Sequence, residues 1–382
     1  EPVSFYEAPT RKELWNLLDQ TCSENCDYVV IPHNSNLSNG YMFEEPDQDE
    51  MLIQSTKEPL VEIFQHKGSS ECNIEPNDPL CNFEQLPYKD FRSKFQNDLS
   101  PSPDSSFVRE ALGNGLLFQE KQSINPLKFG IIASTDTHLG TPGAVDEGLF
   151  QGHGGAGKSF RSSIPEGLPD DIEFNPGGLA VAWAEENSRS AIFDAFKRKE
   201  VYGTSGPRFI VRFFIGDNLD KNLCNNPDNI SYAYANATPM GGTIASDSLS
   251  QPSIFISASA DSSIKDQFIE KLQVVKGVVR NGELLTTVHD VGVTDAQSKL
   301  DISNCEVTGS GEKAMCSVWN DPNFNSSENA YYYVRVVANK SCRWSHNLCL
   351  QNPEYCEADS DASIPKVIQE RAWTSPVWLE KT

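Results

Sequence analysis

The sequence predicts an α/β domain over residues 1–205, followed by an antiparallel β-sandwich domain over residues 206–382. In the first part, patterns typical of strands alternate with patterns typical of helices, which favours a parallel sheet. From Arg208 onward, short apolar runs are separated by Gly, Asn, Asp and Pro, which is typical of antiparallel strands. A chain of 382 residues is long enough for two or three domains, each with its own core.

The first expected elements are a helix and a strand. Thr10 and Glu13 have the spacing of a capping box, in which each side chain satisfies a free backbone amide at the start of a helix. The leucines that follow give this helix an apolar stripe. The β-rich run at residues 28–31 then predicts a buried strand that delivers His33 at its end.

Two further strands are expected at Leu60–Phe64 and Phe129–Ala133, with a helix at about Ser106–Leu117 between them and another at about Ser188–Lys199. All three strands of the first half are followed by ionisable residues. Because the carboxyl ends of parallel strands meet at one edge of a sheet, these side chains are expected to gather there. Three strands are too few to close a β/α barrel, so the sheet is either small and open or completed by another polypeptide.

The second half is expected to be a disulfide-containing sandwich with strands at Phe209–Ile215, Ser253–Ser257, Leu272–Val279 and Tyr331–Val337. It holds six of the ten cysteines, which lack the paired spacing of a zinc ribbon, so disulfides are the simpler interpretation. Disulfides favour an extracytoplasmic location, secreted, periplasmic or on the cell surface. Five sequons are compatible with a secreted glycoprotein: Asn36, Asn229, Asn236, Asn325 and Asn339.

The charge of the chain excludes several classes of partner. Lys and Arg number 31 against 54 Asp and Glu, which gives a formal net charge of −23. Such a field repels nucleic acids and acidic membrane surfaces. Apolar runs also stay well short of the roughly 18 residues that a membrane span requires. We therefore expect neither a nucleic-acid partner nor a membrane span.

Asp136 and His138 form the strongest candidate metal site. They stand two residues apart just after a strand, and in an extended backbone such residues project from the same face. His33, at the end of a neighbouring strand, could add a third ligand to give the nitrogen and oxygen set that suits Zn, Mn or Fe. The alternative is that these histidines are hydrogen-bonded structural residues, and the sequence leaves it open.

Glu62 and Lys67 are candidates for further roles near that site. Glu62 interrupts an apolar run, where an unpaired buried charge is costly, so it needs either a metal-site partner or a structural Lys or Arg. His66, Lys67 and Glu71 follow the same strand, where they either bind an anionic substrate or form a solvated loop.

The segment from Gly152 to Ser159 has the letters of a phosphate-binding loop, including Lys158. The context argues against nucleotide binding, because residues 147–151 make a poor strand and Pro165 follows soon after. A flexible lid beside Asp136 or an ordinary surface loop are the remaining interpretations, since the glycines leave the backbone around His153 unusually free.

Several ordered blocks resemble the domain-of-unknown-function 3604 family, whose first domain is similar to the PHP (polymerase and histidinol phosphatase) metallohydrolases. These blocks are Ile31–Gly40, Glu58–Ile63 with Lys67–Cys72, Ser134–Gly143, Ala184–Arg189, Arg198–Gly206, Cys342–Ser345 and Gln369–Pro376. The resemblance covers almost the whole chain. It implies that residues 1–205 are the C-terminal part of a distorted, PHP-like β/α barrel that binds two or three divalent metal ions, Zn, Mn or Fe.

By motif, the resemblance implies that His33, Asp136 and His138 are metal ligands and that Glu62 lies near the site. The early His-x-His motif of such barrels is missing from this sequence. The chain therefore looks like the larger, proteolytically processed part of a precursor, with an N-terminal fragment of the same precursor as the partner that carries the remaining ligands.

The resulting functional prediction is a metal-dependent hydrolase in which metal-activated water attacks a small anionic phosphoester. Glu62 and Lys67 are its candidate catalytic residues, Lys67 through binding of the substrate anion. The alternative from another class is a non-catalytic secreted scaffold or binding protein that retains the fold and uses the sandwich as its working surface.

Overall fold

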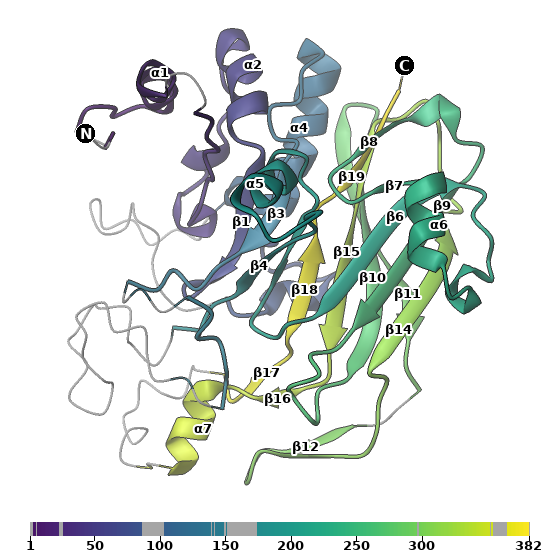
Figure 1. Ribbon diagram of the computed structural model, residues 1–382. Helices are drawn as coiled ribbons and strands as arrows, with labels where there is room; N and C mark the ends of the chain where they lie inside the picture. Colours follow the sequence, from purple (N-terminus) through teal and green to yellow (C-terminus); the bar gives the residue numbers. More distant parts are fainter. Residues whose placement is uncertain are drawn as a thin grey trace.

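The protein is described by a computed structural model that covers residues 3–4, 6–22, 26–85, 103–138, 140, 142–148, 150, 174–295, 298–351, 353 and 365–381. It is a mixed α/β structure with several antiparallel sheets, and its described elements lie in three layers (Figure 1). The first layer holds a small sheet and helices, the second an eight-stranded sheet, and the third a four-stranded sheet.

The α-helices are α1 (Arg11–Thr21), α2 (Gln48–Lys57), α4 (Val108–Gln122), α5 (Arg189–Lys197), α6 (Asn229–Asn236) and α7 (Trp344–Gln351). The strands of the first half are β1 (Leu60–Gln65), β2 (Gly68–Ser69), β3 (Gly130–Ala133), β4 (Leu179–Ala182) and β5 (Val201–Thr204). The other strands are β6 (Ile210–Asp217), β7 (Ala237–Pro239), β8 (Thr243–Ala245), β9 (Pro252–Ser259), β10 (Ile269–Arg280), β11 (Glu283–Val293), β12 (Lys299–Asp301), β13 (Glu306–Thr308), β14 (Ala314–Asn320), β15 (Ala330–Ala338), β16 (Ser341–Cys342), β17 (Val367–Ile368), β18 (Arg371–Thr374) and β19 (Val377–Glu380). In the part of the chain that the structure describes, no helix is long and apolar enough to cross a membrane.

The first layer confirms the expected parallel pair. β1 and β3 are parallel neighbours, with Leu60 opposite Gly130, and α4 lies between them in the chain. The capping box also forms, because Thr10 accepts from the backbone of Glu13 and the Glu13 side chain accepts from the backbone of Thr10. The sequence therefore located the two strands that end beside the candidate site.

The predicted strand at residues 28–31 is wrong. This segment runs beside β1 without forming a regular ladder. The Val30 N–H donates to the carbonyl of Lys57 at 2.9 Å, and the Glu62 N–H donates to the carbonyl of Pro32 at 3.0 Å. Pro32 has no N–H to donate, and strand-like pairing is limited to these spaced bonds.

The eight-stranded sheet lies between the other layers, and both faces of its central strands β15, β18 and β5 are buried. Its order is β11-β10-β15-β18-β5-β4; β19 also pairs with β15, and β8 pairs with β19. Along β15, Tyr332, Val334 and Val336 pack in the core shared with β6 and β9. Tyr331 and Tyr333 instead pack in the core shared with β1, β3 and α4. This alternation explains why every residue of β15 is buried.

The third layer has the order β14-β9-β6-β7 and faces the eight-stranded sheet across one core (Figure 1). The four strands expected in the sandwich are all present at the positions predicted from sequence: β6 and β9 in this layer, and β10 and β15 in the eight-stranded sheet. The eight-stranded sheet takes β4 and β5 from the first 205 residues and its other strands from later ones. A domain boundary at residue 206 thus stays a prediction.

Four disulfides bridge described cysteines: Cys22–Cys26, Cys72–Cys81, Cys224–Cys316 and Cys305–Cys342. They confirm the expectation from the cysteine count. Two of the five sequon asparagines are buried in the folded chain: Asn36 is 9% exposed, and Asn339 is 4% exposed with its amide donating to the carbonyl of Asp266 at 3.1 Å.

The end of β3 is held tightly against the central sheet by Gly203 of β5. A Cβ placed on Gly203 would lie 2.8 Å from the backbone nitrogen of Ala133 and 2.9 Å from the carbonyl carbon of Ile132. Such distances are shorter than ordinary van der Waals contact, so only glycine allows the two backbones to approach this closely.

Candidate functional site

The candidate site lies where the parallel strands β1 and β3 end. His66 and Lys67 follow β1, and Asp136 and His138 follow β3 by a few residues. Because the two strands are parallel neighbours, their carboxyl ends bring these side chains to the same edge of the sheet. The sequence predicted this meeting of strand ends.

Asp136 lies between two imidazoles. Its Oδ2 is 3.5 Å from Nδ1 of His66, and its Oδ1 is 3.4 Å from Nε2 of His138. Asp136 has a φ of 55°, in the left-handed region that costs energy for a residue other than glycine. Backbone strain of this kind is concentrated at functional sites. Each carboxylate oxygen thus faces a different imidazole.

His66 is the better buried of the two histidines. It is 6% exposed, its Nδ1 lies 3.3 Å from the carbonyl oxygen of Thr135, and its ring contacts Phe174 edge-on at 5.0 Å between centroids. The His138 side chain is 57% exposed. One imidazole is therefore fixed in the protein and the other is accessible to a ligand from solvent.

Glu62 and Lys67 form a buried ion pair beside this group. Oε1 of Glu62 lies 3.6 Å from Nζ of Lys67, and the two side chains are 5% and 2% exposed. Lys67 also donates to Oγ of Ser70 at 2.6 Å, and Ser134 donates to Oε2 of Glu62 at 3.2 Å. Of the two partners left open for Glu62, the structure provides the lysine.

Burial lowers the pKa of Lys67, because removal from water disfavours the ammonium form. The negative charge of Glu62, and that of Asp136 to a smaller extent, oppose this shift and favour the charged lysine. The Lys67 ammonium group is therefore an internal counter-charge for Glu62 and, more weakly, for Asp136.

His33 lies on the other side of β1 from β3. The Asn34 N–H donates to Oε1 of Glu62 at 3.4 Å, and Gln65 donates to Oδ1 of Asn34 at 2.9 Å, so the segment around His33 is attached to β1. The His33 ring itself is exposed, with Nδ1 3.4 Å from the carbonyl oxygen of Ile31. Its role as a ligand beside Asp136 stays a prediction.

The glycine-rich segment at residues 152–159, with His153 and Lys158, lies outside the described residues. Its interpretations as a lid, a surface loop or a phosphate-binding loop are untested.

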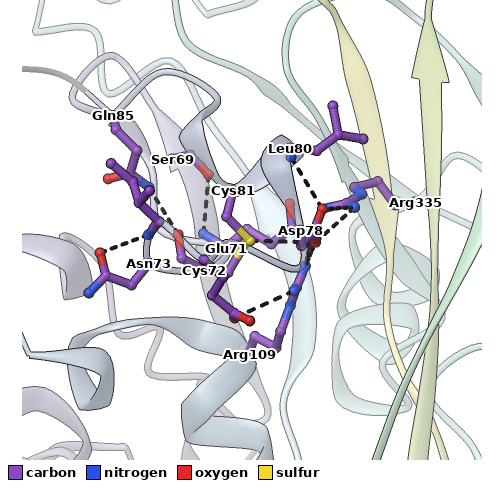
Figure 2. Close-up of a disulfide and its surroundings, with 12 residues drawn as sticks. Ser69, Glu71, Cys72, Asn73, Asp78, Leu80, Cys81, Gln85, Arg109 and Arg335 are labelled. Carbon is purple, nitrogen blue, oxygen red and sulfur yellow. Dashed lines mark hydrogen bonds and ion pairs between the residues drawn. A yellow bond between two sulfur atoms is a disulfide. The ribbon is translucent and has the colours of Figure 1, made fainter. Parts of the chain in front are cut away.

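A buried charge network that sequence reasoning missed surrounds Glu71, which follows Lys67 closely in the chain (Figure 2). Glu71 accepts from Arg109 at 2.8 Å and from Arg335 at 2.9 Å, and Asp78 accepts from both arginines at 2.9 Å. The disulfide between Cys72 and Cys81 closes the loop that carries Asp78, and Glu71 immediately precedes that loop. One signal for this network was present in the sequence, since Arg335 interrupts the apolar run of β15.

The charges of the network determine its protonation. Burial disfavours the charged form of Glu71, but the guanidinium groups of Arg335, Arg109 and Arg371 outweigh this effect and hold its pKa well below the usual range. Glu71 is therefore ionised at neutral pH, and its loop is linked to the central sheet by charge-assisted hydrogen bonds. The possible role of Glu71 in a solvated loop is thus wrong, because the residue is 1% exposed.

Two other groups have the residue types of a metal site but contain oxidised cysteines. Cys305, Cys342 and His346 come together, as do Cys72, Asp78 and Cys81. In both groups the two cysteines form a disulfide, so their sulfurs are not available as thiolate ligands. Among the described residues, these are the groups of three or more candidate ligand atoms that lie within 4.8 Å of one another.

The comparison with protein families assigns the chain to one family. The model of the family described as "Protein of unknown function (DUF3604)" matches residues 1–381. The chain belongs to the DUF3604 family. No curated protein and no solved structure matches it. The expected membership in DUF3604 is confirmed over the whole chain, whereas the likeness of this family to the PHP metallohydrolases stays a prediction.

Proposed function

We propose that this DUF3604 chain is the larger part of a metal-dependent hydrolase that cleaves phosphoesters with a metal-activated water. The observation that carries the proposal is the carboxylate of Asp136 between the imidazoles of His66 and His138, at the carboxyl ends of two parallel strands. Nitrogen and oxygen donors in this combination suit Zn, Mn or Fe.

The spacing of the donor atoms fits metal binding. Two ligand atoms at about 2.1 Å from one tetrahedral ion lie about 3.4 Å apart. The two nitrogen–oxygen distances at Asp136 are 3.4 and 3.5 Å. Because different oxygens face the two histidines, Asp136 would contact one ion together with His138 and a second ion together with His66. Two or three divalent ions are therefore proposed, with His33 as a further ligand.

Bound metal ions would lower the pKa of a water toward about 7 and would hold the oxygens of the substrate. The residues of the chain have separate tasks. Asp136 and His138 hold the metal, and the more exposed His138 lies on the solvent side. Lys67 and Glu62 balance the charges beside Asp136. The positive ammonium group of Lys67 is also proposed to attract an anionic substrate.

We further propose that the remaining donors come from an N-terminal fragment of the same precursor. An imidazole and one carboxylate oxygen are too few ligands for an ion that takes four. Strands from the fragment would extend the pair β1–β3 into a PHP-like barrel and cover its edges. The four disulfides support an extracytoplasmic location for this assembly.

The experiment is elemental analysis of the native assembly, with hydrolysis of bis-(4-nitrophenyl) phosphate as the activity assay. Asp136→Asn and His138→Ala are expected to lose most bound metal and at least a hundredfold in activity. The matched controls are Asp301→Asn and His289→Ala, which change exposed or half-buried residues of the sandwich. Both controls should keep metal and activity.

Native protein without a transition metal, together with unchanged hydrolysis in His138→Ala, would contradict the enzyme. That result would favour a non-catalytic secreted scaffold that binds through the sandwich. The fragment is tested separately by mass spectrometry of the denatured assembly, where a peptide with a His-x-His motif is expected. A single species with the mass of this chain would overturn the two-chain proposal.

A further inference from the structure

The sandwich end of the molecule contains a cavity of about 610 Å³. Three of its lining residues are lysines, Lys271, Lys299 and Lys340, and one is acidic, Glu270. The chain as a whole carries a net charge of −23. A cavity with three cations and one anion is therefore a local reversal of the charge of the protein.

The lining acid is already engaged elsewhere. Oε2 of Glu270 accepts a hydrogen bond from Nε2 of Gln369 at 2.9 Å. Lys271 is 3.8 Å from Oδ2 of Asp290, which is a long and weak ion pair. Lys299 and Lys340 are exposed, so their ammonium groups can turn toward a ligand at the mouth of the cavity. The lysines thus provide positive charge that the protein itself neutralises only in part.

Part of the wall is apolar, and the remainder includes the polar side chains of Thr294, Ser298, Ser310 and Asn339. Phe268 and Ile269 lie at the start of β10, Val293 at the end of β11, and Leu300 and Ile302 in and after β12. A binding site for a small organic molecule typically has such an apolar lining with a few polar groups that orient the ligand, and volumes of about 300–1,000 Å³ are usual.

The walls are also fixed relative to each other. Cys305, in the turn after β12, forms a disulfide with Cys342 of β16. His346 of α7 lies 2.7 Å from the carbonyl oxygen of Ile302 through its Nε2. Lys299 and Lys340 therefore stand on two segments that are covalently linked, at the end of the molecule where Figure 1 shows β12, β16 and β17. A ligand can bind in a pre-formed cavity without a large entropic cost for ordering the protein around it.

We propose that this cavity binds a small organic anion, with a carboxylate, sulfate or phosphate group attached to an apolar body. The acidic group pairs with the ammonium groups of Lys299, Lys340 and Lys271, and the apolar body lies against Phe268, Leu300 and Ile302. The site is separate from the strand-end histidines and does not depend on the proposed hydrolase activity.

The test is a fluorescence titration with 8-anilino-1-naphthalenesulfonate, an aromatic sulfonate. One saturable site per chain is expected. The double variant Lys299→Glu, Lys340→Glu should raise the Kd at least tenfold, while Asp136→Asn should leave it unchanged. The matched control is Lys12→Glu, Lys221→Glu, which makes the same change in net charge outside the lining and should bind like the native chain. Circular dichroism of both double variants verifies that they are folded.

Binding should also weaken as salt rises from 50 to 500 mM, because ion pairs at an open cavity are screened. Naphthalene-2-carboxylate and 1-naphthyl phosphate, used as competitors, then identify the preferred acidic group. Equal Kd values for the two double variants would overturn the proposal. So would equally tight binding of the neutral probe N-phenyl-1-naphthylamine, since the lysines would then play no part.

Discussion

Arg335 and Glu71 stand 264 residues apart in the chain and form a buried ion pair, with 2.9 Å between Nη1 and Oε1. Arg335 belongs to β15 in the central sheet, and Glu71 to the loop after β2 in the first layer. Their side chains are 0% and 2% exposed. The pair joins the layer of the candidate site to the sandwich, so that the strand ends near Asp136 have a rigid support.

Glu71→Gln is expected to destabilise the protein by about 3–5 kcal/mol, because it removes one of the two carboxylates that balance the buried guanidinium groups of Arg109 and Arg335. The measurement is chemical denaturation of the native and variant proteins. Glu120→Gln is the control, since the Glu120–Lys381 pair is exposed at the surface and should contribute less than about 1 kcal/mol. Similar losses for the two variants would show that the network adds little beyond an ordinary surface pair.

Gly203→Ala is expected to cost about 1–3 kcal/mol through overpacking. The new Cβ meets the backbone of Ile132 and Ala133 rather than a movable side chain, so β3 has to shift. Gly282→Ala is the control for backbone strain without overpacking. A Cβ at Gly282 would meet open space, so the cost of this substitution comes from its φ of 81°. Thermal stability and metal content are measured for both variants. Gly203→Ala should lower both quantities, whereas Gly282→Ala should lower the stability alone. Unimpaired metal binding in Gly203→Ala would contradict the proposed coupling between β5 and the site.

Much of this architecture was predictable because local patterns determine it. The strands at Leu60–Phe64 and Phe129–Ala133 and the cap of α1 follow from short-range signals, and the structure contains them with shifts of one residue at most. The parallel pairing of β1 and β3 also brings His66 to Asp136, although the sequence analysis expected His33 rather than His66 beside this carboxylate. These features depend on periodicity and on strand direction, both of which can be read from sequence.

Other features depend on contacts between distant residues, and no local pattern contains them. The segment at residues 28–31 has strand-like composition, yet its hydrogen bonds are spaced too widely for a ladder. The buried arginine at position 335 signals a partner without identifying Glu71 or Asp78. For the same reason the sequence did not show that the sheet containing β15 has both faces covered.

The pH dependence of stability is expected to include a contribution from Glu58. Burial raises the pKa of this carboxyl group to about 6, although the hydrogen bond from Gln54 partly offsets the shift. The folded state therefore holds the proton more tightly than the unfolded state, whose pKa is near 4.5. Stability should fall by about 2 kcal/mol in total as pH rises from below 4.5 to above about 6.

Glu58→Gln should remove this part of the pH dependence while keeping a side chain of the same size. Urea denaturation at a series of pH values from 4 to 7 measures the effect. The free energy of unfolding of the variant, relative to that of the native protein, is expected to increase as pH rises. Parallel stability curves for the two proteins would rule out a raised pKa at this position.

The disulfides are expected to differ in their contribution to stability. Cys224–Cys316 closes a loop of 92 residues and Cys22–Cys26 one of 4. The chain-entropy model then gives about 4–5 kcal/mol for the first and about 2 kcal/mol for the second. Replacing both cysteines of each pair by serine, followed by denaturation under non-reducing conditions, compares them directly. An equal loss in the two double variants would indicate that loop length does not determine the effect here.

The two histidines that flank β1 are expected to contribute to metal binding in different degrees. His66 lies 3.5 Å from Asp136 and is buried, so His66→Ala should remove a donor that is already in place and lower metal affinity 10- to 100-fold. His33 is exposed and joins the site only if the ring turns toward it, so His33→Ala tests the role that the family resemblance implies. Titration of the metal-free assembly with Zn²⁺ measures both, with His289→Ala as the control. A loss in His33→Ala equal to that in His66→Ala would establish three histidines around Asp136. Unchanged affinity in His66→Ala would instead show that its contact with Asp136 is purely structural.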